Sequence, residues 1–161
     1  MKIREYNQCV DQYADGVYRF ILKHLKDEDR AKDVVQDAFL KMWEKKDQIE
    51  NGKFKSYLFT TAYHTMIDLI RRNKKIQYRD DLPMHSSYSE INPPDLKTLL
   101  NEALERLPAI QKTVILLRDY EGYNYEEIGE ICSLKPSQVK VYIYRARVSL
   151  KSYIRKPELV I

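Results

Sequence analysis

The stretch NYEEIGEICSLKPSQVKVYIYRARVSLKSYI, residues 124–154, predicts two helices joined by a short turn. The first helix should run from about Tyr125 to Cys132, with Asn124 as its N-cap, because an asparagine oxygen accepts from the free N–H groups of a first turn. The turn is Ser133-Leu134-Lys135. Pro136 suits the first turn of the next helix, where its missing N–H removes no hydrogen bond. The spacing is that of a helix-turn-helix.

The second helix of this stretch is predicted to have an apolar face and a basic face. Its apolar residues recur at i, i+4, i+7 and i+11 and should face the core: Val139, Ile143, Ala146 and Leu150. From Lys135 to Lys156 the chain holds seven basic residues and no acidic one. In a helix-turn-helix this helix enters the major groove, where arginine and lysine read guanine or phosphate and glutamine can pair with adenine. A DNA-binding face is favoured over a merely solvated one, because the unbroken charge coincides with the motif.

Nearer the N-terminus, AKDVVQDAFLKMWEK (residues 31–45) predicts an amphipathic helix. Its apolar stripe should be buried and consists of Val34, Val35, Ala38, Phe39, Met42 and Trp43. The opposite face carries Asp33, Gln36, Asp37 and Glu44. Leu40 projects among these polar residues. A single exposed leucine is ordinary, but a leucine surrounded by acids could also dock against the helices of a partner, and the pattern leaves both interpretations open.

A further helix is predicted through SYLFTTAYHTMIDLIRRNKK, residues 56–75. Just before it, Phe54 and Tyr57 are expected in a lysine-containing loop that opens at Asn51-Gly52. Aromatic rings between lysines suit stacking on unpaired bases beside a charged backbone, although two core aromatics on a loop are an equally good interpretation. The basic run that follows, from Arg71 to Arg79, is better explained by phosphate contacts than by a solvated helix end.

Composition places the chain among all-α proteins with two small helical domains. Its 161 residues include only four glycines and six prolines, too few for many short strands and their turns. A segment with Pro83, Pro93 and Pro94 and no apolar period has the character of a linker. We therefore predict one domain at 1–75, a flexible linker at 76–95 and a second domain at 96–156. Leu107-Pro108 should break the first helix of the second domain.

Several functional classes are disfavoured by what the sequence lacks. It has no glycine-rich phosphate loop, no metal-ligand spacing and no Ser/His/Asp order, so we expect no enzyme, no cofactor and no metal site. Cys9 and Cys132 lie far apart and are expected to be free thiols in a reducing compartment. No apolar run approaches the length of a membrane span, and the N-terminus lacks a signal-peptide core, so we expect a cytoplasmic protein.

Three stretches resemble the extracytoplasmic-function (ECF, group 4) sigma factors of the sigma-70 family. They are DRAKDVVQDAFLKMWEK, FKSYLFTTAYHTMIDLIRRNKK and LPAIQKTVILLRDYEGYNYEEIGEICSLKPSQVKVYIYRAR, and they occur in order and at the family's spacing. The part from about Tyr13 to Lys75 resembles region 2, and the part from about Leu99 to Arg155 resembles region 4. The resemblance implies a region 2 helical bundle and a region 4 helix-turn-helix.

The resemblance also implies roles for three sets of residues. The set for binding core RNA polymerase, at the clamp helices of its largest subunit, is Asp33, Gln36, Asp37 and Leu40. The set for the melted −10 element is Phe54, Tyr57, Tyr63, His64 and Asp68, with Arg71 and Arg72 at nearby phosphates. The set for the −35 duplex is Ser137, Gln138, Lys140, Val141, Tyr144 and Arg145.

The function implied by the resemblance is that of a sigma factor. Such a protein binds core polymerase, recognises −35 duplex and melted −10 DNA, and starts transcription without catalysing a reaction itself. An anti-sigma factor, often membrane-bound, is an implied partner. The alternative is a helix-turn-helix regulator that is not a polymerase subunit, which the helical first 72 residues disfavour, because a receiver domain would need alternating strands and helices.

The chain departs from the family pattern at three positions. His64 stands where many relatives have asparagine, which leaves the identity of the flipped −10 base open. Ser133 replaces a glycine of the turn. Lys135 replaces the serine that usually caps the last helix, and the loss of that cap should weaken the helix end by about 1 kcal/mol.

Overall fold

A computed structural model describes residues 2–77 and 95–155 of the chain, and these residues form helices and turns with no strand. The predicted all-α fold is confirmed. The helices are α1 (Ile3–Leu25), α2 (Glu28–Glu44), α3 (Phe54–Gln77), α4 (Leu96–Glu105), α5 (Ala109–Ile115), α6 (Tyr125–Cys132) and α7 (Pro136–Ile154), with a 3₁₀ turn η1 (Lys46–Gln48) and a π-helical turn η2 (Leu116–Tyr120). Most of the predicted linker at 76–95 lies outside the described residues.

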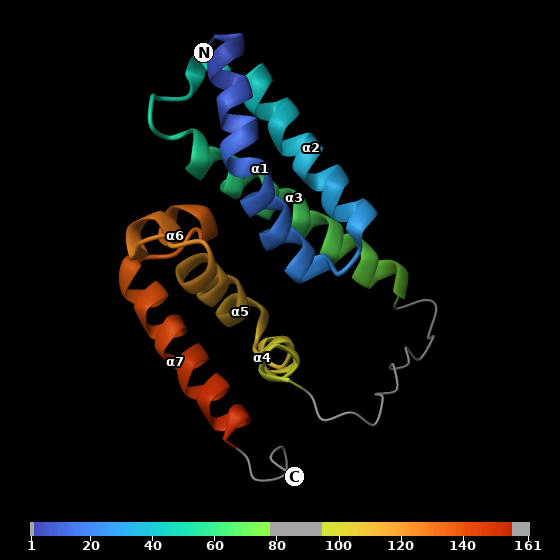
Figure 1. Cartoon of the computed structure of the whole chain (residues 1–161), viewed down its shortest axis with the longest axis vertical. Coiled ribbons are helices and arrows are strands. Elements are labelled where there is room, and N and C mark those ends of the chain that lie inside the picture. The colour runs from blue at the N-terminus through green and yellow to red at the C-terminus, as the bar shows by residue number, and fades with distance from the viewer. Residues whose placement is uncertain (1, 78–94, 156–161) are drawn as a thin grey trace. The chain divides into compact units, whose positions relative to one another are not determined.

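Contacts divide the chain into two compact units, Met1–Asp81 with Gly129–Ser133, and Leu82–Ile128 with Leu134–Ile161. In the first unit, α1, α2 and α3 lie side by side and each packs against the other two (Figure 1). Their buried side chains include Phe20 of α1, Met42 of α2 and Phe59 of α3. The rings of Phe20 and Phe59 lie 5.7 Å apart between centroids, so aromatic packing joins α1 to α3.

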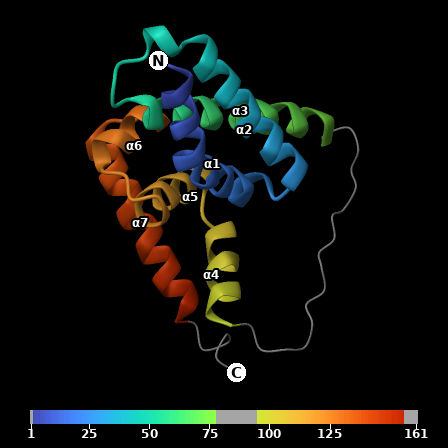
Figure 2. The same cartoon turned by 45° about the horizontal axis from the view of Figure 1, so that its top comes forward.

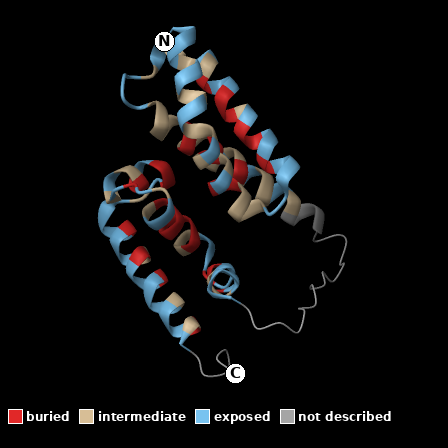
Figure 3. Cartoon of the chain, viewed as in Figure 1, coloured by how far each residue is buried: buried red, intermediate tan, exposed pale blue. Residues whose placement is uncertain are grey.

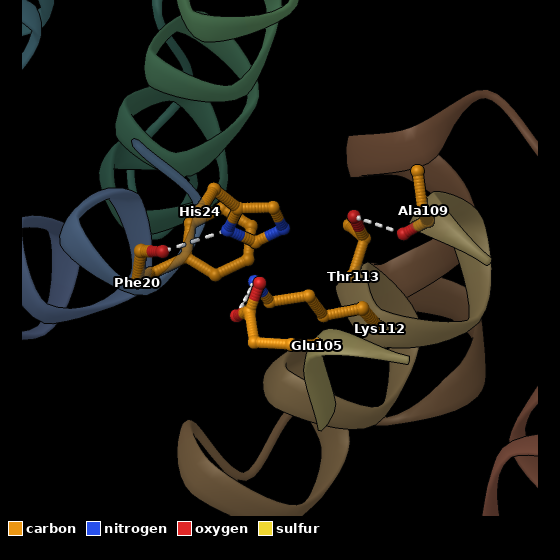
Figure 4. Close-up of polar contacts among 6 residues, drawn as sticks. All are labelled: Phe20, His24, Glu105, Ala109, Lys112 and Thr113. Atoms are coloured by element: carbon orange, nitrogen blue, oxygen red, sulfur yellow. Dashed lines mark hydrogen bonds and ion pairs between the residues drawn. The ribbon is translucent and has the colours of Figure 1, made fainter. Parts of the chain in front are cut away.

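Local signals set the ends of the first two helices. Lys26 adopts a left-handed conformation after α1, and Asp27 then caps α2 by accepting from the backbone N–H of Arg30 at 3.2 Å. Within the last turn of α1, Nδ1 of His24 donates to the carbonyl of Phe20 at 2.8 Å (Figure 4). The predicted apolar stripe of α2 is buried except at Trp43, which is half-buried.

The start of α3 corrects one prediction. Phe54 and Tyr57 do not lie in a loop: α3 begins at Phe54, and the backbone N–H of Tyr57 already donates to the carbonyl of Lys53 at 3.0 Å. The loop is confined to the residues around Gly52, whose φ of 87° favours glycine. Both aromatic side chains are half-buried in the first turns of the helix.

In the second unit, the predicted break at Leu107-Pro108 is confirmed, since α4 ends at Glu105 and Pro108 occupies the N-cap position of α5. The Nζ of Lys112 donates to Oε1 of Glu105, and Oγ1 of Thr113 donates to the carbonyl of Ala109 at 3.0 Å (Figure 4). The ion pair therefore bridges the two helices across the break.

Helix α7 packs against both α4 and α5. Figure 2 shows α4 beside the last turns of α7, where the Tyr153 hydroxyl donates to Oε2 of Glu102 at 3.2 Å. The guanidinium of Arg106 lies over the Tyr153 ring, 4.6 Å from its centroid. These contacts hold the end of α7, while its first half carries the predicted DNA-reading face.

The sequence did not predict the π-helical turn η2. There the backbone N–H of Glu121 donates to the carbonyl of Leu116, five residues back, at 3.1 Å. Such turns are rare and are frequent at functional sites. This one widens the end of α5 just before the helix-turn-helix.

Candidate functional site

The first helix of the helix-turn-helix has the bounds that the sequence predicted. Helix α6 runs over Tyr125–Cys132 and is capped at Asn124, whose Oδ1 accepts from the backbone N–H of Glu127 at 2.8 Å. The Glu127 carboxylate accepts in turn from the backbone N–H of Asn124 at 3.1 Å. This reciprocal pair is a capping box and confirms the predicted N-cap.

The turn between α6 and α7 holds both of the chain's departures in this motif. Ser133 has a φ of 59°, in the left-handed region that favours glycine, so its backbone is strained. Lys135 is the N-cap of α7 and has no side-chain oxygen with which to cap. Instead, its backbone N–H donates to Oε1 of Gln138 at 2.9 Å. The cap of α7 therefore depends on a side chain that was predicted to read DNA.

The two faces of α7 are those that the sequence predicted, with a buried inner face and an exposed outer face (Figure 3). Val139, Ile143 and Ala146 are buried and Leu150 is half-buried. All six residues predicted to read the −35 duplex are exposed: Ser137, Gln138, Lys140, Val141, Tyr144 and Arg145. Four of them line one pocket together with Tyr142, which the sequence did not single out: Ser137, Gln138, Val141 and Arg145.

Two exposed apolar side chains stand among the basic residues of this face. Val141 is 44% exposed and Tyr144 is 69% exposed. An apolar side chain on a major-groove helix can contact the methyl group of thymine. The face is therefore suited to read bases as well as to hold phosphates.

Arg147 differs from the other basic residues of α7. Its Nη2 donates to Oδ1 of Asp119 in η2 at 2.7 Å. The hydrogen bond that Arg147 donates to the Asp119 carboxylate raises the pKa of Arg147. Twenty-eight residues separate the pair in sequence, so no local pattern could have predicted it. The guanidinium binds within the protein rather than being directed to a ligand.

In the first unit, Leu40 is 55% exposed on the outer face of α2, as predicted. Asp33 and Gln36 are exposed beside it, and Asp37 is half-buried. Oδ2 of Asp37 lies 2.9 Å from the Nζ of Lys41, which also donates to Oγ1 of Thr65 on α3 at 3.5 Å. The spacing of Asp37 and Lys41, at i and i+4, is a signal that could have indicated this pair.

The residues predicted to hold −10 DNA occupy a long part of α3. With a rise of about 1.5 Å per residue, Phe54 and Arg72 lie about 27 Å apart along the helix. At about 100° per residue, four of the seven fall on one stripe about 60° wide: Tyr57, His64, Asp68 and Arg71. Tyr63 is directed to one side of this stripe, with its ring centroid 6.5 Å from that of Phe20 on α1 and 5.7 Å from the His64 ring.

A groove between α2 and α3 brings the two predicted sets of the first unit together. It is lined by Asp33, Val34, Asp37 and Lys41 of α2 and by Thr65, Asp68, Leu69 and Arg72 of α3. Lys41 and Thr65 are groove residues that sequence reasoning missed. The predicted polymerase-binding face and the predicted −10 surface are therefore adjacent.

Other kinds of site find no support in the described ranges 2–77 and 95–155. There, no group of three His, Cys, Asp or Glu side chains could hold a metal ion. Burial raises the pKa of the Cys132 thiol to about 12, so this thiol stays protonated. None of the helices described is both long enough and apolar enough to cross a bilayer.

Comparisons with known proteins assign both halves of the chain. Residues 9–76 match the family described as Sigma-70 region 2, and residues 97–150 match the family described as Sigma-70, region 4. Over 154 residues the chain is 32% identical to RNA polymerase sigma factor SigV of Bacillus subtilis (strain 168), covering 94% of this chain and 92% of that protein. It is 30% identical to ECF RNA polymerase sigma factor SigW of the same organism, covering 91% of this chain and 87% of that protein.

Solved structures have the same fold. The sigma factor RpoE, in a co-crystal with the anti-sigma factor NepR from Bartonella quintana, superposes with a TM-score of 0.80 at 26% identity, covering 96% of this chain and 99% of that one. CnrH, in complex with the cytosolic domain of CnrY, has a TM-score of 0.71 at 22% identity, covering 95% and 89% of the two chains.

Proposed function

The chain belongs to the sigma-70 family, as an ECF sigma factor that directs RNA polymerase to promoters, and from this premise we propose how its surfaces share that work. Sigma factors are not enzymes, so the phosphodiester chemistry is that of the polymerase. The alternative of a regulator outside the polymerase is not favoured, since relatives that are sigma factors align with nearly the whole chain.

We propose that residues 96–156 form the −35 reader. Helix α7 enters the major groove with its exposed first half, where Ser137, Gln138, Lys140, Val141, Tyr144 and Arg145 meet the duplex. Exposure of all six side chains on one helix face, without an acidic residue among them, supports this assignment. Arg145 is the residue best suited to guanine, because its guanidinium can donate twice to O6 and N7.

We propose that residues 1–75 form the −10 and polymerase-binding domain, and that residues 76–95 connect it to the −35 reader. The stripe of Tyr57, His64 and Asp68 on α3 holds unpaired −10 bases, and Arg71 and Arg72 hold adjacent phosphates. Phe54 extends this surface at the start of α3, and Tyr63 supports it from the side near α1. Melting is then driven by binding, because extrusion of a base costs a few kcal/mol that stacking and hydrogen bonds recover.

We propose that Leu40, with Asp33, Gln36 and Asp37, docks on the clamp helices of the largest polymerase subunit. A leucine that is 55% exposed on a polar helix face supports this role, because burial against a partner would remove its apolar surface from water. The α2–α3 groove lies between this face and the −10 surface. Polymerase and melted DNA would therefore meet on neighbouring parts of one helix pair.

We also propose an anti-sigma partner and a cytoplasmic location. The solved relative RpoE was crystallised with an anti-sigma factor. A protein that works on core polymerase and promoter DNA would do so in the bacterial cytoplasm.

The observation that carries this proposal is the exposed, acid-free outer face of α7 together with the exposed Leu40 on α2. The test is run-off transcription with purified core polymerase on a promoter recognised by the full chain, beside the same template with a scrambled −35 segment. Specific transcripts that appear only with the chain and the intact promoter are expected. Equal transcription from both templates would contradict the −35 assignment.

A further inference from the structure

The cap of α7 restricts what Gln138 can read. Lys135 is the N-cap, and its side chain offers only donors, so it cannot accept from the free N–H groups of the first turn. The hydrogen bond at this helix end runs the other way, from the Lys135 backbone N–H to Oε1 of Gln138 at 2.9 Å. Gln138 is thereby held by its oxygen, and the residue is exposed at the start of the predicted reading face.

An adenine reader needs both ends of the glutamine amide. In the bidentate pairing, Oε1 accepts from the adenine N6 amino group while Nε2 donates to N7. Both amide atoms must then point at the base edge in one plane. When Oε1 accepts from the Lys135 N–H, one of its two lone pairs is used and the amide plane is fixed at the helix end, which leaves the two N–H donors better placed than Oε1 to meet a base.

A lone amino group favours guanine over adenine. Guanine presents two major-groove acceptors, N7 and O6. Adenine presents one acceptor and an amino donor, and that donor would face the Gln138 amino group with no acceptor between them.

From this we infer that Gln138 reads guanine, and not adenine, in the −35 duplex. The inference rests on the proposed −35 role of α7 and adds the base that one of its residues selects. It also makes Lys135 a positioning residue that sets this base preference through Gln138.

Two substitutions test separately the capping hydrogen bond from the Lys135 N–H and the amide donors of Gln138. Lys135→Pro removes the backbone N–H but keeps the carbonyl that accepts from Gln138 and Val139, and the φ of −74° at this position lies within the range of proline. It frees Oε1 and should move the preference from guanine to adenine. Gln138→Glu keeps an acceptor for the Lys135 N–H but has no donor, so it should lose guanine while α7 stays capped.

The experiment uses holoenzyme assembled from the full chain and core polymerase, with a promoter library randomised over the −35 segment. Transcripts are sequenced for wild type, Gln138→Ala, Gln138→Glu, Lys135→Pro and Arg145→Ala. The position read by Gln138 is the one whose base preference disappears in Gln138→Ala. We expect wild type to favour guanine over adenine there by about fivefold or more, and Lys135→Pro to reverse that order.

The possible outcomes distinguish a failure of the guanine inference from a failure of the −35 role. Adenine preferred by wild type at that position, or base preferences unchanged in Gln138→Ala while Arg145→Ala alters them, would overturn the inference and leave the −35 role intact. Unchanged preferences in both alanine variants would instead overturn the −35 role. If Lys135→Pro loses helicity by circular dichroism, Gln138→Glu decides: guanine preference lost at an unchanged unfolding midpoint supports the inference, and guanine preference kept refutes it.

Discussion

The guanidinium of Arg147 lies 2.7 Å from Oδ1 of Asp119 and ties α7 to the π-helical turn η2. Arg145, two residues earlier, is exposed on the outer face of the same helix. Two arginines that look equivalent in sequence therefore have different roles, one within the protein and one at the predicted DNA surface.

Replacing either arginine should separate stability from DNA recognition. Arg147→Ala should lower the free energy of unfolding by less than about 1 kcal/mol, since the ion pair is solvent-exposed, and should leave promoter discrimination unchanged. Arg145→Ala should weaken −35 binding by about 1–3 kcal/mol with unchanged stability. Urea denaturation and holoenzyme binding to matched and scrambled duplexes measure both. Loss of discrimination in Arg147→Ala would contradict the division.

Leu40→Asp should reduce affinity for core polymerase without unfolding the first unit, because the side chain is already 55% exposed. The matched control is Ile3→Asp, which places the same charge on another exposed apolar residue of this unit, 66% exposed on α1. Competition for core polymerase against a labelled sigma factor measures affinity, and thermal denaturation checks the fold. Equal losses in both variants would argue against a docking role for Leu40.

Ser133→Gly should stabilise the helix-turn-helix by about 0.5–1 kcal/mol, because glycine adopts the left-handed conformation of this turn without the Cβ clash that serine has. Ser137→Gly, four residues on and inside α7, should instead destabilise by up to about 1 kcal/mol. The two midpoints in urea are compared with that of wild type. A lower midpoint for Ser133→Gly would show that the serine hydroxyl stabilises the turn by more than its backbone strain.

Asp95 should make α4 sensitive to acid. Its carboxylate caps α4 by accepting from the backbone N–H of Thr98 at 2.8 Å, and this hydrogen bond lowers the pKa of Asp95. A pKa that is lower in the folded state contributes stability above the unfolded value near 4 and loses it as pH falls. Between pH 6 and pH 3, about two units above and one unit below the unfolded pKa, the free energy of unfolding should therefore fall more in wild type than in Asp95→Asn. Identical losses in urea titrations of both proteins would contradict this role.

Much of the fold follows from local sequence signals. Asn124 and Pro136 mark where α6 and α7 begin, and Pro108 marks the break before α5, because caps and prolines act within one turn of the chain. The apolar period of α2 likewise predicted which side chains are buried and that Leu40 is not. The same local reasoning placed Phe54 in the loop, although the loop ends one residue before it.

The candidate site was less predictable where it depends on packing. The groove between Asp37 and Asp68 exists only because α2 and α3 pack side by side, and the pairing of Asp119 with Arg147 joins segments far apart in the chain. The engagement of Gln138 was hidden for another reason. An exposed glutamine on a basic helix is naturally interpreted as a base contact. Its capping role is recognised only if one also considers that the Lys135 side chain has no acceptor.

The π-helical turn sets the phase between α5 and everything that follows it. In this turn each hydrogen bond spans five residues instead of four, so the turn holds one residue more than an α-helical turn. It has the form that a helix takes after the insertion of a single residue. Deleting a single residue just before Asp119 would restore the ordinary α-helical spacing and change where the Asp119 carboxylate lies relative to Arg147. A change in chain length at this point would therefore alter the contact that holds α7 to this turn, rather than lengthen or shorten a loop.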